Sequence, residues 1–310
     1  MHPGMQPGMH PGMQPGMHPG MQPGMHPGMQ MQGGMNYGMA PGMMPPAPSF
    51  APSINTTELL AALPYGIFVK QKFDILEVIT GMDMENTYMV YERGPNPETD
   101  VAPRPLFMCK EKSTWCARNC MAASAKPFEM KVFKCFDGHN AILNDPVLSM
   151  FRECKCTCLC FNRPELVVYY TEGKRNDYLG KVIDTWDCMH HSFQVIDAQG
   201  AVRYTIQANC CQCGLCCKCP CEPCEKVVFE LWSGKMAKME GQILKLGKRN
   251  ILQNMLSNAD NFSIPFPPGS TWQDRSLLLS AVLMIDFMLF EEKQESNTQR
   301  SHRVPGVYLD

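Results

Sequence analysis

The apolar run at residues 276–290 constrains the fold of this chain more than any other feature of the sequence. It starts at Ser276, passes through Leu283 and ends at Phe290, and Asp286 is its only charged residue. A helix that is apolar on every side has to be enclosed by protein or by lipid. A helix of this length spans about 22 Å, against about 30 Å for the hydrocarbon core of a bilayer, so a buried helix is favoured over a membrane span.

The residues just before this run predict where the helix begins. Thr271 and Asp274 have the spacing of a capping box, and Ser270 and Gln273 offer a second register. If the polar turn from Thr271 is included in the helix, with Trp272 as an interfacial anchor, a short membrane span remains an alternative.

The segments between residue 58 and this helix favour β-strands. Residues 128–133 alternate apolar and charged side chains, and residues 193–196 and 202–206 flank Asp197 to Gly200 as in a hairpin. Further strands are expected at 75–80, 88–91 and 227–231, and a brief helix at 58–63. Many short strands with glycine-bearing turns predict an antiparallel sandwich or barrel.

The first 57 residues differ in kind from the rest of the chain. They contain no Asp, Glu, Lys or Arg, and they begin with an HPGMQPGM octapeptide repeat. Such a segment cannot bury a core, so we expect a disordered tail at 1–57, a domain at 58–292 and a short flexible tail at 293–310. Pro45, Pro46 and Pro48 suit an SH3- or WW-type domain, although a flexible spacer is the favoured interpretation because short proline motifs are common in such linkers.

The charge balance excludes one broad class of function. The formal net charge is -2, which argues against a nucleic-acid-binding protein. The sequence also lacks a phosphate-binding loop of the G-x4-G-K-S/T form, so we expect no ATP-driven step.

All 17 cysteines fall between Cys109 and Cys224, and an odd number fits a disulfide framework poorly. In the first cluster, every second residue is a cysteine, which places the thiols on one face of an extended chain. Basic and apolar neighbours make this cluster suitable for S-acylation. Its members are Cys154, Cys156, Cys158 and Cys160.

The second cluster contains repeated C-x2-C spacings, which are usual for structural zinc. Zinc binding, acylation and unliganded loop thiols all remain open for it. The candidate zinc ligands are Cys210, Cys213, Cys216, Cys219, Cys221 and Cys224. Cys188 lies close to His190 and His191, but nothing marks an oxyanion hole, so we expect no catalytic site and no enzyme activity.

Several blocks in order resemble the phospholipid scramblase family, from about residue 59 to 291. They are LEVITG at 76–81, C-x-RNC at 116–120, KPF at 126–128, the two cysteine clusters, DNF-x-I-x-FP at 260–267 and IDFM-x-FE at 285–291. The resemblance implies a tubby-like antiparallel β-barrel around a hydrophobic C-terminal helix, and palmitoylation of the first cluster. It also implies calcium-triggered, ATP-independent movement of phospholipids in both directions, at the plasma membrane with most of the chain cytoplasmic.

The calcium segment departs from the family pattern. The ligand positions that the resemblance implies are Asn258, Asp260, Phe262, Ile264, Phe266 and Gly269. Only one of them is a carboxylate, whereas calcium prefers several oxygen ligands. The alternating apolar residues are typical of a core-facing strand, so we expect millimolar or absent calcium binding.

Two hypotheses follow. The first is a scramblase-like membrane protein, which needs an oligomer or a thinned bilayer because one short helix cannot form a lipid path alone. The second is a palmitoylated or zinc-binding cysteine-rich interaction module without lipid transport.

Overall fold

The computed structural model describes the chain in segments. These are residues 55–72, 85–113, 126–136, 140–141, 143–155, 161–216, 224, 226–247 and 261–291. The expected strand at 75–80, the proline motif at 45–48 and most of the predicted tails lie outside the described residues.

The described strands form one antiparallel sheet that closes on itself. In chain order they are β1 Gly66–Lys72, β2 Thr87–Arg93, β3 Val101–Lys112, β4 Phe128–Phe136, β5 Asn140–Ala141, β6 Leu148–Arg152, β7 Glu165–Tyr170, β8 Asp177–Thr185, β9 His190–Asp197, β10 Val202–Asn209, β11 Lys226–Ser233, β12 Lys238–Leu246 and β13 Asn261–Pro265. Their spatial order is β3-β2-β1-β13-β12-β11-β10-β9-β8-β7-β6-β4-β5, and an additional β3–β4 pairing closes a barrel of twelve strands. The short β5 pairs only with β4 among the described strands.

The helices are few in the described part of the chain. They are α1 Thr56–Ala62, the 3-10 turn η1 Glu172–Lys174, α4 Cys213–Cys216 and α5 Trp272–Asp286, which continues into a π-helical turn, η3 Phe287–Glu291. The helix expected at 58–63 is α1, which begins after Asn55 and ends before Leu63.

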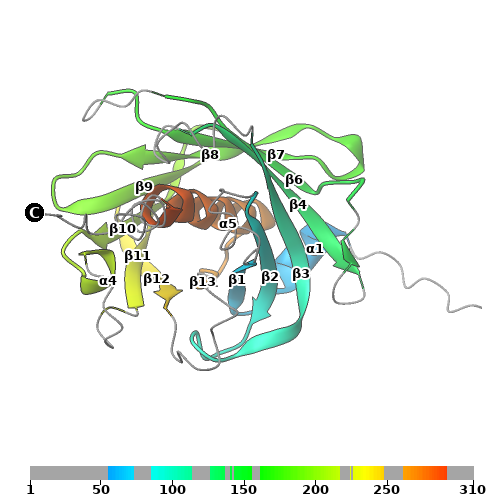
Figure 1. The fold of residues 1–310 in the computed structure, drawn as a ribbon, viewed down its shortest axis with the longest axis horizontal. Coiled ribbons are helices and arrows are strands. Elements are labelled where there is room, and N and C mark those ends of the chain that lie inside the picture. The colour runs from blue at the N-terminus through cyan, green and yellow to red at the C-terminus, as the bar shows by residue number, and fades with distance from the viewer. Residues whose placement is uncertain are drawn as a thin grey trace, which may run out of the picture. The chain divides into compact units, whose positions relative to one another are not determined.

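Helix α5 runs through the ring of strands (Figure 1). Leu278, Val282 and Leu283 on it have no exposed surface, and neither do strand residues such as Val90 and Val195. The interior of the barrel is therefore filled by the helix as well as by strand side chains. This explains why the helix is apolar on every side, and it confirms the prediction of a helix buried in a β-barrel.

Among the helices that the structure describes, none is both long enough and apolar enough to cross a membrane.

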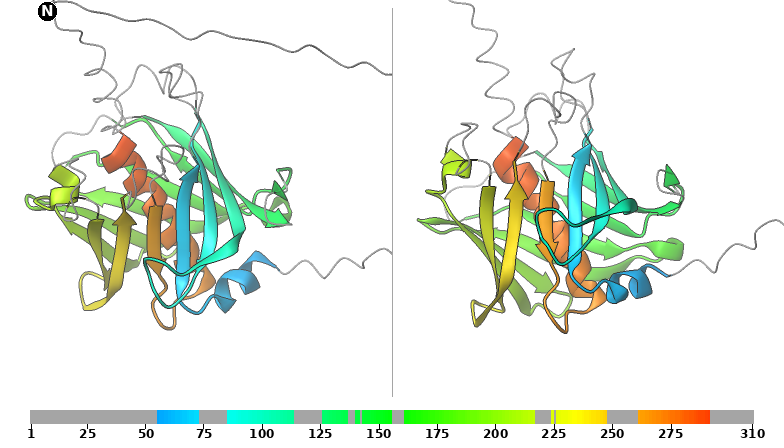
Figure 2. Two further views of the ribbon diagram at one scale, coloured as in Figure 1. Left: turned by 60° about the horizontal axis from the view of Figure 1, so that its bottom comes forward. Right: turned by 90° about the horizontal axis from the view of Figure 1, so that it is seen from below.

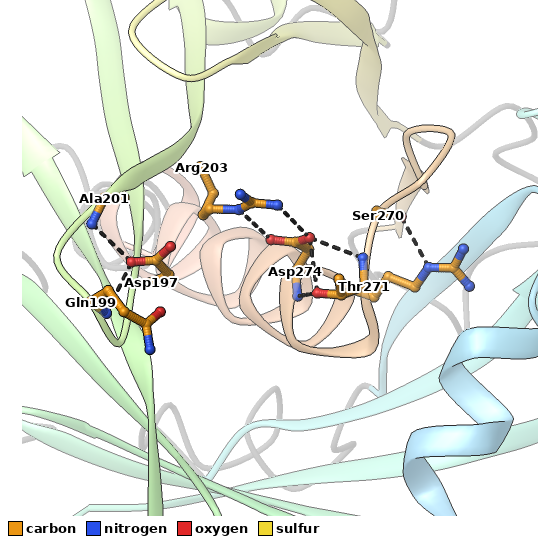
Figure 3. Close-up of polar contacts among 8 residues, drawn as sticks. Asp197, Gln199, Ala201, Arg203, Ser270, Thr271 and Asp274 are labelled. Carbon is orange, nitrogen blue, oxygen red and sulfur yellow. Dashed lines mark hydrogen bonds and ion pairs between the residues drawn. The ribbon is translucent and has the colours of Figure 1, made fainter.

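The predicted hairpin is β9–β10. Its turn is held by Asp197, whose carboxylate accepts the backbone N–H groups of Gln199 at 3.0 Å and Ala201 at 2.8 Å (Figure 3). Gly200 has a φ of 84°, a conformation that favours glycine. The other expected strands at 88–91, 128–133 and 227–231 lie within β2, β4 and β11.

The antiparallel registers assign every strand end to one of two rims. Phe128 pairs with Arg152, and Asn209 pairs with His190, so the ends of β4, β6, β9 and β10 meet on the same rim. The strand ends on this rim are Lys72, Thr87, Lys112, Phe128, Arg152, Glu165, Thr185, His190, Asn209, Lys226, Leu246 and Asn261. We call it the cysteine rim, and we call the opposite one the α1 rim. Figure 2 shows α4 and the C-terminal end of α5 at the former and α1 at the latter.

Candidate functional site at the cysteine rim

The described members of both cysteine clusters lie at the cysteine rim. Cys154 follows β6 and its side chain is exposed. Cys188 lies in the β8–β9 turn and is exposed as well. Five more belong to the β10–β11 connection: Cys210, Cys211, Cys213, Cys216 and Cys224. Cys156, Cys158 and Cys160 lie outside the described residues, so a common face of the first cluster stays a prediction.

The start of the β10–β11 connection is tied firmly to the barrel. The Gln212 side chain donates to the Val228 carbonyl at 2.8 Å and accepts the Val228 N–H at 2.9 Å. The thiols of Cys210 and Cys211 are 3.9 Å apart, and this contact raises the pKa of Cys210. The Cys216 thiol donates to the Cys210 carbonyl at 3.1 Å.

The zinc hypothesis gains no support from these contacts. Within the described segments, no group of three or more His, Cys, Asp and Glu side chains is arranged to hold a metal ion. Cys219 and Cys221 lie outside those segments, so zinc binding by the whole cluster stays a prediction.

The end of the expected calcium segment belongs to the core. Phe262 and Ile264 lie in β13 and Phe266 just follows it, and their exposed fractions are 1%, 0% and 6%. β13 pairs with β1 on one side and β12 on the other, so it is not an edge strand. These three side chains therefore fit the core-facing strand interpretation. Asn258 and Asp260 lie outside the described residues, and the weak or absent calcium binding stays a prediction.

The cysteine rim also contains a buried polar contact at the end of α5. Asp286 is 4% exposed, and the Tyr88 hydroxyl donates to its Oδ2 at 2.7 Å. A carboxylate at a helix C-terminus is disfavoured by the helix dipole, so this donor is a needed partner. The next residue, Phe287, stacks on Phe128 with ring centroids 4.1 Å apart, and Phe290 packs edge-on against Phe262 at 6.0 Å.

Next to this contact lies a buried ion pair. Lys126 and Glu111 are 0% and 2% exposed, with Nζ and Oε1 3.9 Å apart. The Lys126 ammonium also lies 5.9 Å from the centre of the Phe287 ring. Glu111 accepts the backbone and side-chain N–H groups of Asn86, both at 2.9 Å. Charges buried this deeply require such partners, so the end of α5 is fixed by polar contacts as well as by packing.

Comparison with known proteins assigns the chain to a family. The Scramblase family model matches residues 46–292.

The chain belongs to the scramblase family.

Curated scramblases are similar over about three quarters of this chain. Phospholipid scramblase 1 of Rattus norvegicus is 28% identical over 237 residues, which is 76% of this chain and 62% of the relative. Phospholipid scramblase 1 of Homo sapiens is 27% identical over 225 residues, 73% of this chain and 63% of the relative. Phospholipid scramblase 2 of Bos taurus is 25% identical over 227 residues, 73% of this chain and 68% of the relative. The alignment thus spans less than two thirds of the length of the scramblase 1 relatives. No solved structure gives a significant match.

In this scramblase-family chain, a further charged cluster supports the cysteine rim. Arg163 forms an ion pair with Asp184, which is 4% exposed. Burial raises the pKa of Asp184 to about 6, although Arg163 and then Arg152 oppose the shift. Arg152 is 3% exposed and lies 5.8 Å from the centre of the Phe128 ring.

The α1 rim holds the start of the scramblase helix α5. Arg203 of β10 donates two hydrogen bonds to the Asp274 carboxylate, from Nε to Oδ1 at 2.9 Å and from Nη2 to Oδ2 at 3.0 Å (Figure 3). Thr271 and Asp274 form the predicted capping box. Ser270 does not cap the helix; its hydroxyl accepts the Arg275 Nε–H at 3.0 Å.

Sequence reasoning missed the polar partners at both ends of α5. The Tyr88–Asp286 and Arg203–Asp274 contacts join residues 198 and 71 positions apart, so spacing gave no signal for them. Lys126 and Glu111 are closer in the chain, on either side of the β3–β4 connection, but no motif marked them as a pair. The one available signal was that Asp286 interrupts an apolar run, which indicates a buried partner. The sequence places His190 together with Cys188 as a candidate nucleophile site. In the structure, the Nδ1 of His190 lies 3.2 Å from the Asp187 carboxylate.

Proposed function

We propose that this protein is a membrane-associated scramblase-like protein that moves phospholipids between leaflets in both directions without ATP, by translocation rather than bond chemistry. The observation that carries the proposal is the Scramblase family match over residues 46–292, four fifths of the chain. The curated relatives named above are phospholipid scramblases, which supports phospholipid as the substrate class. We place the protein at the plasma membrane with most of the chain cytoplasmic.

The lipid path in this proposal lies outside the barrel interior. The interior is filled by α5, of which residues 276–286 are buried, so it offers no room for a lipid headgroup. A path formed between copies of the protein, or through a bilayer thinned next to it, agrees with this packing. We therefore expect activity to depend on homo-oligomers or on bilayer thickness.

Reconstitution tests the proposal directly. The purified full-length chain is inserted into vesicles that contain a headgroup-labelled phospholipid, and a membrane-impermeant reductant then bleaches the outer leaflet. Empty vesicles should keep about half of their signal, whereas active vesicles should lose most of it without ATP. An unchanged protected signal in vesicles that demonstrably contain the protein would refute lipid movement. Repeating the assay at increasing calcium concentrations tests whether calcium triggers lipid movement. We expect the rate of signal loss to respond only at millimolar calcium or not at all.

Membrane anchoring is proposed to depend on acyl chains on Cys154, Cys156, Cys158 and Cys160. Several chains are needed for stable anchoring, because one chain binds only marginally. Changing these cysteines to Ala should move most of the protein expressed in animal cells from the membrane fraction to the soluble fraction. The matched control changes the same number of cysteines in the second cluster, Cys210, Cys211, Cys213 and Cys216. A first-cluster variant that stays fully membrane-bound would place the anchor elsewhere.

The second candidate is a zinc-binding cysteine module, which is suggested by the repeated C-x2-C spacing of the second cluster. Elemental analysis beside acyl-exchange labelling separates the two. Stoichiometric zinc without acyl chains would support the module and would contradict acyl anchoring.

A further inference from the structure

The cysteine rim carries exposed large apolar side chains at the tips of its connections. Phe161, which precedes β7, is 72% exposed. Trp186 and Met189, on either side of the β8–β9 turn, are 49% and 55% exposed. Side chains of this size are usually buried at least in part. Other exposed large apolar side chains lie toward the α1 rim, namely Tyr65, Leu143, Tyr178, Met236 and Met239. What distinguishes Phe161, Trp186 and Met189 is that they lie on neighbouring connections of one rim, next to exposed thiols.

Backbone contacts bring these tips next to one another. The Asp184 N–H donates to the Pro164 carbonyl at 3.0 Å, which sets the segment containing Phe161 beside the end of β8. The Cys210 N–H donates to the Met189 carbonyl at 3.0 Å, which sets the turn beside the end of β10. Figure 1 shows β7, β8, β9 and β10 as neighbours in the barrel wall.

The β8–β9 turn is held in shape by its own side chain. Asp187 Oδ1 accepts the N–H groups of Met189 at 2.8 Å and His190 at 3.0 Å. Trp186 and Met189 are thus presented on a preformed turn, and little conformational entropy is lost when they are covered.

The charges around the tips are compensated in pairs. Lys155 and Lys181 both donate to Glu165, at 2.6 Å and 3.1 Å, and Arg163 pairs with Asp184. A surface with paired charges attracts an anionic partner only weakly. Among the described residues of these tips, the apolar side chains are therefore the groups left without a partner of their own kind.

We propose that Phe161, Trp186 and Met189 insert into the interfacial layer of a lipid bilayer, so that the cysteine rim faces the membrane. Tryptophan and other amphipathic side chains favour the boundary between headgroups and acyl chains. The exposed thiols of Cys154 and Cys188 lie at the same rim, which is where acyl chains would have to enter the bilayer. A protein partner fits less well, because a stable protein interface uses about 20–30 residues a side. This inference rests on the proposed membrane function and adds an orientation to it.

Vesicle partition of the full-length chain made in bacteria, and therefore without acyl chains, tests the proposal. The rim variant combines Phe161→Ser, Trp186→Ser and Met189→Ser. The matched control combines Tyr178→Ser, Met236→Ser and Met239→Ser, which lie toward the α1 rim and are 40%, 42% and 39% exposed. On phosphatidylcholine vesicles, the rim variant should bind at least about tenfold more weakly and the control within about twofold of the parent. An equal loss in both, no loss in the rim variant, or no binding by the parent would overturn the proposal.

Tryptophan quenching gives a second readout that a mere loss of folding would not mimic. Phosphatidylcholine with brominated acyl chains should quench the parent's emission, and Trp186→Phe should remove most of this quenching. Trp232→Phe, which changes a half-buried tryptophan near the other end of β11, should leave it in place. The reverse pattern would place the α1 rim at the membrane and refute the assignment.

The outcomes separate this inference from the proposed function. Weak binding by the rim variant, together with an inactive parent in the lipid-transfer assay, would leave the insertion standing and refute lipid movement. Equal vesicle binding by the rim variant and the parent, together with an active parent in the lipid-transfer assay, would refute the insertion and leave lipid movement standing. If light scattering shows a parent dimer that the rim variant abolishes while vesicle binding is unchanged, the rim joins two copies of the chain and the insertion is refuted.

Discussion

Replacing Asp274 with Ala tests how α5 is held inside the barrel. Asp274 is 3% exposed, and its carboxylate serves the helix and the barrel wall at once. Its Oδ2 accepts the Thr271 N–H and hydroxyl, both at 2.9 Å, and both oxygens accept hydrogen bonds from Arg203. The substitution therefore removes a helix cap, a two-pronged ion pair and a favourable charge at a helix N-terminus.

The magnitude follows from these contacts. The lost capping contact costs about 1 kcal/mol, and the lost charge at the helix N-terminus costs about 0.5 kcal/mol. The Arg203 side chain is 43% exposed, so solvent screens the ion pair and we assign it only about 1–2 kcal/mol. We expect Asp274→Ala to lower the free energy of unfolding by about 3 kcal/mol. Asp274→Asn, which keeps an acceptor for the cap, should cost about half as much.

Denaturant unfolding of the full-length chain, followed by far-UV circular dichroism, measures this effect. A double-mutant cycle with Arg203→Ala should give a coupling of about 1 kcal/mol or more. The control cycle uses Lys238 and Glu240, a pair near the same rim in which the Lys238 side chain is 75% exposed, and we expect a coupling of less than about 0.5 kcal/mol. A loss below about 1 kcal/mol in Asp274→Ala, or strict additivity with Arg203→Ala, would refute this account of the helix start.

Three further predictions concern the interior and the cysteine rim. Leu283→Ala should cost about 2–5 kcal/mol in the same assay, because Leu283 has no exposed surface; a cost below about 1 kcal/mol would mean that α5 lies outside the core. Tyr88→Phe should cost about 1–3 kcal/mol, because it removes the hydroxyl that donates to buried Asp286, and an unchanged midpoint would argue against that contact. The pKa of Asp184 is raised by burial to about 6, so its protonated form is favoured by folding, and its contribution to stability falls as pH rises from about 4 to about 6. Across that window the stability of Asp184→Asn relative to the parent should therefore rise by up to about 3 kcal/mol, and a flat difference would refute the raised pKa.

The elements with local signals could be predicted from the sequence. The capping box of Thr271 and Asp274 marked the start of α5 correctly, because its contacts lie within one helical turn. The all-round apolarity of 276–290 left protein or lipid as its surroundings, and its short length favoured protein, as the structure shows. The β9–β10 hairpin followed from two apolar segments that flank a glycine-bearing turn.

The polar contacts that fix the helix could not be predicted in this way. Tyr88 and Asp286 are 198 positions apart, and Arg203 and Asp274 are 71 apart. They meet only because the barrel closes through the β3–β4 pairing and α5 then lies inside it. The gathering of the described members of the two cysteine clusters at one rim has the same origin, since it depends on the up-and-down order of the strands. The two clusters are separate in the chain, and spacing within each gave no sign that they share a rim.

The place of α5 in chain order has a consequence for how the protein is made. Every described strand precedes this helix, yet the inward faces of the strands have little to pack against until it arrives. During synthesis the inward-facing side chains of β1 to β13 therefore stay unpacked until α5 has been made. The contacts between α5 and the first strands form last, and they are among the most distant in sequence. Folding that depends on such contacts is slow and leaves apolar strands open to aggregation in the meantime. A nascent chain that stops before residue 272 contains the strands of the barrel but not helix α5, and we expect it to require chaperones or to be degraded.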